Sequence, residues 1–219
     1  AAIKLAERLD HQEAVAKIYT NLAHIAVRRQ DFVEANQHYQ AALDTYSAIH
    51  KEIECVTIQV NQATVHNLAE HHHEALAIIE QVLEPLEHFG AIWQKAAALQ
   101  IQAEAHLGLG NLAEAAQFAH RVIQEEHGEV LHEGYRTMGT VLLRQGHAPE
   151  AEQHIRYSLE LLKEKLQPFD YAYSLRALAE VYQVTEQAAE ATVTFNKTIA
   201  LFEELDLDKE VEKTKVMMK

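Results

Sequence analysis

A fivefold internal repeat constrains this chain more than any other feature of its sequence. The pattern is Glu-Ala, an apolar residue four positions after the alanine, and a small or β-branched residue three positions further on. Self-similarity at a fixed period is the signature of a repeat architecture. The five alanines are 40, 40, 36 and 40 residues apart, a spacing too regular for chance: Ala35, Ala75, Ala115, Ala151 and Ala191.

A second small residue lies twelve positions before each of these alanines. Larger apolar side chains surround it at spacings of three and four, which place them on one face of a helix. Small residues on two paired helices let the backbones approach closely while the larger neighbours interlock. We therefore expect two packed helices per repeat, with these residues at the contact: Ala23, Ala63, Ala103, Gly139 and Ala179.

Short polar or glycine-bearing turns separate the two halves of each repeat, as in 29–31, 70–73, 108–111, 144–147 and 185–187. Gly110 and Gly146 suit the left-handed end of a helix. The chain has only 7 glycines and 3 prolines, so little else interrupts regular structure. Each unit is predicted to be a helical hairpin, and the fold class to be all-α.

This arrangement resembles the tetratricopeptide repeat over essentially the whole chain. The resemblance implies a right-handed superhelical solenoid of antiparallel hairpins, with about five hairpins and partial helices at each end. The usual period is 34 residues, whereas the period here is mostly 40. Long repeats of this kind are similar to those of kinesin light chains, bacterial peptide-pheromone regulators and the sensor regions of signal-transducing NTPase regulators.

We expect a single repeat domain over residues 1–219, excised from a longer protein. Neither end is clearly polar, whereas solenoids need polar caps; a native continuation or self-association through the ends would cover them. The expected units are 11–50, 51–90, 91–128, 129–167 and 168–207, with 1–9 and 208–219 as partial or capping helices.

Composition narrows the classes of partner. The net charge of −14 disfavours direct nucleic-acid binding, which relies on neutralising phosphates, and attachment to an anionic membrane. No apolar run approaches the roughly 20 residues of a membrane helix. Cys55 is the one cysteine, so no intramolecular disulfide can form, and a reducing, cytoplasmic location is expected.

Histidine is abundant, with 15 residues. His71, His72 and His73 are consecutive, and successive residues point about 100° apart on a helix, so an exposed polar turn is favoured over a metal site. His66 and His106 occupy the same repeat position and are expected to pack between helices, with a ligand or pH-sensing role as the alternative.

No catalytic pattern is present. Consecutive carboxylates such as Glu203 and Glu204 diverge on a helix, so they are expected to be solvated. The phosphate loop, the nucleophile elbow and the zinc-protease motif are absent. We expect a non-enzymatic protein without catalytic residues, metal ligands or cofactors.

The resemblance implies that the first helix of each hairpin lines a concave groove for a protein or peptide ligand. Guanidinium groups favour carboxylate recognition there, although the family's specific Lys/Asn/Lys/Arg carboxylate clamp is not found. Carried over by position, the groove residues are Lys17, Thr20, His24, Arg28, Thr64, Asn67, Gln100, Glu104, Arg136, Thr140, Arg144, Tyr173, Arg176 and Glu180.

Three functions remain open from the sequence. The first is a protein- or peptide-binding module that serves as the interaction or sensor region of a larger bacterial signalling or regulatory protein. The second is a small-molecule effector-sensing and self-assembly domain of a signal-transducing NTPase or transcriptional regulator. The third is a self-associating scaffold, that is, a homo-oligomer formed through uncapped ends.

Overall fold

The structure is a computed structural model that describes residues 6, 11–125, 129–163, 165 and 167–219. The regular structure in these residues is entirely α-helical, which confirms the predicted fold class. The chain divides into two compact units, residues 1–109 and 110–219. Across the described ranges, no helix is long and apolar enough to cross a membrane.

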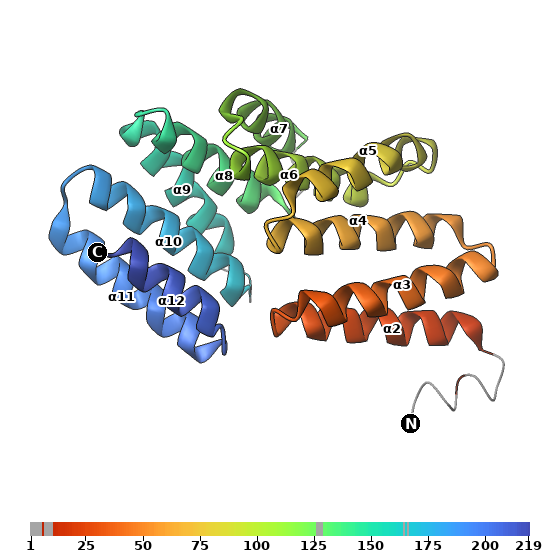
Figure 1. Ribbon diagram of the computed structural model, residues 1–219. Coiled ribbons are helices and arrows are strands. Elements are labelled where there is room, and N and C mark those ends of the chain that lie inside the picture. Colours follow the sequence, from red (N-terminus) through yellow and green to blue (C-terminus); the bar gives the residue numbers. More distant parts are fainter. Residues whose placement is uncertain (1–5, 7–10, 126–128, 164, 166) are drawn as a thin grey trace. The chain divides into compact units, whose positions relative to one another are not determined.

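Unit 1, residues 1–109, contains helices of equal length that follow one another through short turns (Figure 1). Each helix packs on the next one in sequence, and α4 also contacts α6. The helices are α2 (Gln12–Arg28), α3 (Phe32–Ala48), α4 (Glu52–Leu68), α5 (His72–His88) and α6 (Ile92–Gly108).

Unit 2, residues 110–219, continues the same succession of helices, and here α8 also contacts α10 (Figure 1). The predicted end fragment 208–219 contains the last helix. Among the described helices of unit 2, α7, α8, α9 and α12 are shorter than the 17 residues usual elsewhere. The helices are α7 (Leu112–Gln124), α8 (Leu131–Arg144), α9 (Ala148–Leu162), α10 (Pro168–Val184), α11 (Ala188–Glu204) and α12 (Asp208–Met217).

The small residues of the repeat lie where the helices of a pair touch. Ala23 of α2 and Ala35 of α3 are both 0% exposed and belong to one apolar cluster. Gly139 of α8 lies so close to α9 that an added Cβ would be 2.5 Å from Cγ1 of Ile155 and 3.0 Å from the Ala151 carbonyl oxygen. The close helix approach predicted from the sequence is therefore present.

The turns share one backbone geometry but not one residue type. Gly110 and Gly146 have positive φ, as predicted, but so do Gln30, Glu70 and Glu186. At Glu186 the following amide, that of Gln187, donates to the carbonyl of Tyr182, as in a Schellman motif. These hydrogen bonds hold side-chain-bearing residues in a conformation that glycine adopts more easily.

Substitution of Gly139 tests the helix contact. We expect Gly139→Val to lower the free energy of unfolding by about 1–3 kcal/mol, because the added methyl groups overlap α9. Ala200→Val on the exposed side of α11 is the control and should cost less than about 1 kcal/mol. Urea unfolding measures both; equal losses would contradict a tight α8–α9 contact.

Exchange of turn residues tests the backbone strain. Glu186→Gly should raise the free energy of unfolding by about 1 kcal/mol, because glycine adopts positive φ without a Cβ penalty. Gly146→Ala should lower it by a similar amount, since nothing lies within 4 Å of the added Cβ and only the backbone responds. Thermal unfolding of the two variants should therefore shift in opposite directions.

Candidate functional site

Unit 2 brings charged and aromatic side chains together on α8, α10 and α12. Helix α8 contacts α10, and α12 reaches α10 through side chains: Gln183 donates to the Met217 carbonyl over 3.0 Å. Residues four apart on a helix share a face, and six of these positions were predicted from the sequence. We call this surface the unit 2 face: Arg136, Thr140, Arg144, Asp170, Tyr173, Arg176, Glu180 and Glu210.

Tyr173 is the aromatic centre of the unit 2 face. Its ring centroid is 5.8 Å from Cζ of Arg136 and 5.0 Å from Cζ of Arg176, within the range of a cation–π interaction. The two arginine side chains are only 14% and 13% exposed. Packing thus fixes two guanidinium groups, one from each of two consecutive hairpins, beside a single ring.

Both arginines are also paired with carboxylates of their own chain. Arg176 forms an ion pair with Glu210 of α12, whose side chain is 15% exposed. Nη1 of Arg136 lies 3.6 Å from Oδ1 of Asp170. The unit 2 face is therefore a charge-balanced row, because partly buried guanidiniums need compensating groups, and not a bare basic patch.

The pKa values of two acids in this row, Glu180 and Asp170, are shifted in opposite directions. At Glu180 burial raises the pKa above its ordinary value, and the charges of Arg176 and Arg144 offset it only in part. At Asp170 burial also acts to raise the pKa, but the contacts with His132 and Arg136 outweigh it, so the pKa lies below its usual value. Burial thus disfavours the charged form of Glu180, whereas the contacts of Asp170 favour its charged form.

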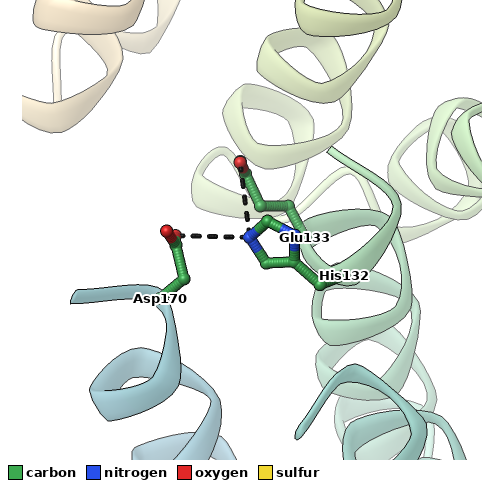
Figure 2. A group of neighbouring side chains, drawn as sticks. All are labelled: His132, Glu133 and Asp170. Carbon is green, nitrogen blue, oxygen red and sulfur yellow. Dashed lines mark ion pairs between the residues drawn. The ribbon is translucent and has the colours of Figure 1, made fainter. Parts of the chain in front are cut away.

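One group of three residues in the described part of the chain could hold a metal ion: His132, Glu133 and Asp170 (Figure 2). His132 and Glu133 are on α8, and Asp170 is in the first turn of α10. No metal ligands were predicted from the sequence, and His132, Asp170 and Glu210 were not among the predicted site residues. Their contacts join different hairpins, so local spacing within one helix does not reveal them.

In unit 1 the predicted groove residues are less closely associated. Lys17, His24 and Arg28 are exposed, and Lys17 pairs with Glu13 on its own helix. Partial desolvation of the His24 ring, together with the charge of Arg28, lowers the pKa of His24. The hydroxyl groups of the predicted threonines donate to carbonyls four residues earlier in their own helices: Thr20 to Ala16, Thr64 to Val60, and in unit 2 Thr140 to Arg136.

Two amides expected to face a ligand are instead buried. Asn67 is 8% exposed and Gln100 is 2% exposed. The Asn67 amide donates to Oε2 of Glu104 over 3.2 Å, and its carbonyl oxygen accepts from Nδ1 of His72 over 2.7 Å. Asn67 therefore joins α4, α5 and α6. These hydrogen bonds occupy the amide groups that would otherwise bind the backbone of a peptide.

The histidine run is more structured than a fully exposed turn. His72 is half-buried, where burial lowers its pKa, and its ring packs so closely on Gly108 that a Cβ there would be 2.2 Å from Nε2. His71 and His73 are exposed. His66 lies beside His71, with ring centroids 6.0 Å apart, and burial lowers its pKa.

Comparison with protein families gives one match in each unit. The tetratricopeptide repeat matches residues 14–87 in unit 1 and residues 133–156 in unit 2. No match was found among curated proteins.

Solved structures share the fold at low sequence identity. NprR in complex with its cognate peptide NprX has a TM-score of 0.81 and 12% identity, with 98% of this chain and 65% of that chain covered. Rap protein complexed with Competence and Sporulation Factor has a TM-score of 0.78 and 15% identity, covering 93% and 57%.

A third structure is a signal transduction ATPase with numerous domains and a tetratricopeptide repeat sensor, from Pyrococcus horikoshii. Its TM-score is 0.68 at 15% identity, with 99% of this chain and 33% of that chain covered. This chain thus spans about a third of that ATPase. With the repeat matches in both units and the packed helix pairs described above, the chain is a tetratricopeptide-like repeat protein.

Proposed function

We propose that this chain is a non-catalytic protein- or peptide-binding module whose ligand contacts the first helices of its hairpins. The observation that carries the proposal is the unit 2 face, where Arg136 and Arg176 are fixed beside Tyr173. NprR, which shares the fold, was solved with a bound peptide. Rigid aromatic and arginine side chains are the residues that contribute most to binding energy at interfaces.

The chemistry of the face favours a peptide that carries a carboxylate next to an apolar group. A guanidinium has five N–H donors in a fixed fork, so Arg136 can bind a ligand carboxylate bidentately. The apolar group would pack on the Tyr173 ring. Because Asp170 and Glu210 now accompany the two arginines, a ligand carboxylate must share or replace one of these partners, which lowers affinity for isolated anions.

The larger context that we propose is a signalling or regulatory protein of bacterial type, in which this chain is the interaction or sensor region. The fold likeness to the sensor-bearing ATPase supports the signalling or regulatory part of this proposal. A small-molecule effector is the second candidate ligand. What supports it is a hollow of about 680 Å³ in unit 1, lined by Cys55, Lys51 and Phe89 among others, since ligand pockets are commonly about 300–1,000 Å³.

Peptide selection tests the first candidate. Peptides selected from a random display library on this chain should lose affinity about tenfold or more when Arg136 and Arg176 are both replaced by glutamine, because a bidentate contact is lost. Fluorescence anisotropy measures binding, and circular dichroism checks that the variant keeps its helicity.

Arg156→Gln is the matched control. Arg156 lies on the second helix α9, stacks on Tyr182 at 5.8 Å and pairs with Glu152 at 2.8 Å, so its replacement also removes a cation–π contact and an ion pair, away from the unit 2 face. Equal weakening by the control would contradict the assignment of the face. Failure to select any peptide would favour the small-molecule candidate.

Substitution of Glu180 tests whether a residue of the unit 2 face lowers the stability of the folded protein. Its pKa is raised in the folded protein, so the folded state favours the protonated acid and loses stability as pH rises through that pKa. Glu180→Gln should therefore unfold at a higher temperature than the parent at pH 7.5, and the difference should vanish toward about pH 4. A variant less stable at pH 7.5 would show that ion pairs, not burial, dominate at this site.

A further inference from the structure

The imidazole of His132 is buried without a hydrogen bond. Its side chain is 1% exposed, and in the described part of the chain neither ring nitrogen has a hydrogen-bond partner. A buried polar group without a hydrogen bond destabilises the folded state, so the position of these two nitrogens calls for a physical reason. The reason lies in the surroundings of Nε2, which is directed at two carboxylates (Figure 2).

The distances around Nε2 fit a shared ion better than hydrogen bonds. Nε2 is 3.6 Å from Oδ1 of Asp170 and 3.8 Å from Oε1 of Glu133, and the three ligand atoms lie within 4.8 Å of one another. Hydrogen bonds would be about 2.7–3.2 Å. Two ligands held about 2.1 Å from one zinc ion at the tetrahedral angle are about 3.4 Å apart, so small side-chain movements suffice.

We propose that His132, Glu133 and Asp170 form a binding site for a divalent transition metal ion, with Zn²⁺ as the preferred ion. One imidazole and two carboxylates supply three ligands, which leaves a position for water. Imidazole favours Zn²⁺ over Mg²⁺ and Ca²⁺, which prefer oxygen ligands alone.

Solvent can reach the site from the Glu133 side. The side chains of Glu133 and Asp170 are 26% and 29% exposed, in contrast to the buried His132. A hollow of about 650 Å³, lined by Glu133, Glu129 and Gln167 among others, lies next to the first of these carboxylates. An ion can therefore enter and keep a bound water while the imidazole remains shielded.

Arg136 competes with the proposed ion for the carboxylate of Asp170. Its Nη1 lies 3.6 Å from Oδ1 of Asp170, the same oxygen that faces Nε2 of His132. A guanidinium and a metal ion both require this carboxylate, and their like charges repel one another. Removal of the guanidinium should therefore strengthen metal binding, an effect opposite to the one expected for peptide binding.

A bound ion would join α8 to the first turn of α10, and so connect two consecutive hairpins of unit 2. His132 and Asp170 both lie near the ends where Leu131 and Pro168 begin these helices. Because binding to the folded state alone adds its free energy to stability, the ion would stabilise unit 2.

Zinc titration of the whole chain, after treatment with a chelator, tests the proposal. Isothermal calorimetry should detect one Zn²⁺ bound more tightly than any others, with a rise in the melting temperature. Asp170→Asn and Glu133→Gln keep the side-chain shapes and should each weaken this event at least about tenfold, because a charged ligand is lost. Arg136→Gln should strengthen it.

Histidines elsewhere in the chain are the main source of false signals, so His120→Ala is the control. His120 is exposed on α7 of the same unit, and its loss should leave the tight event unchanged. His132→Ala should abolish it, and circular dichroism checks its fold. Unchanged zinc affinity in Asp170→Asn and Glu133→Gln would overturn the proposal, as would tighter binding of Ca²⁺ or weaker binding in Arg136→Gln.

Discussion

The close approach of paired helices at small residues is the constraint on which the rest of the structure depends. Ala23 and Ala35, whose side chains are single methyl groups, are fully buried in one cluster, and at Gly139 even one methyl group would be too close to α9. Larger residues around these points interlock and supply the buried apolar area. This packing sets how the hairpins follow one another, and so brings Arg136 of α8 within reach of Tyr173 of α10.

The helices could be predicted from the sequence because the pattern that defines them is local. Spacings of three and four around Ala63 or Ala179 define a buried face without knowledge of the partner helix. The left-handed turn at Gly146 could likewise be predicted from its residue type. At Glu186 residue type gave no such signal, since hydrogen bonds between backbone groups impose the same conformation.

The site was predicted only as a set of positions. Arg136, Tyr173 and Arg176 were identified because first-helix positions follow the repeat, but their partners Asp170 and Glu210 were not. Pairing between helices depends on the offset of one hairpin relative to the next, which the repeat period alone does not determine. For the same reason Asn67 and Gln100 were expected at a ligand surface, although the neighbouring helices bury them.

Asp170 connects the two proposals physically. Its Oδ1 faces both Nε2 of His132 and Nη1 of Arg136. An ion bound through His132 would take this carboxylate from Arg136, whose guanidinium would then be available to a ligand carboxylate. Metal and peptide would in that case favour each other's binding, and by linkage the effect would be equal in both directions.

The shorter third step of the repeat, 36 residues instead of 40, has a consequence for how the chain can vary in length. Helices α7 and α8 have 13 and 14 residues instead of 17, so the lost residues come from their adjoining ends. A deletion inside a helix would rotate every later side chain by about 100° per residue and destroy its contacts. Loss at adjoining ends leaves the face of each helix unrotated, which makes the α7–α8 junction the natural point for insertions and deletions during the evolution of such a protein.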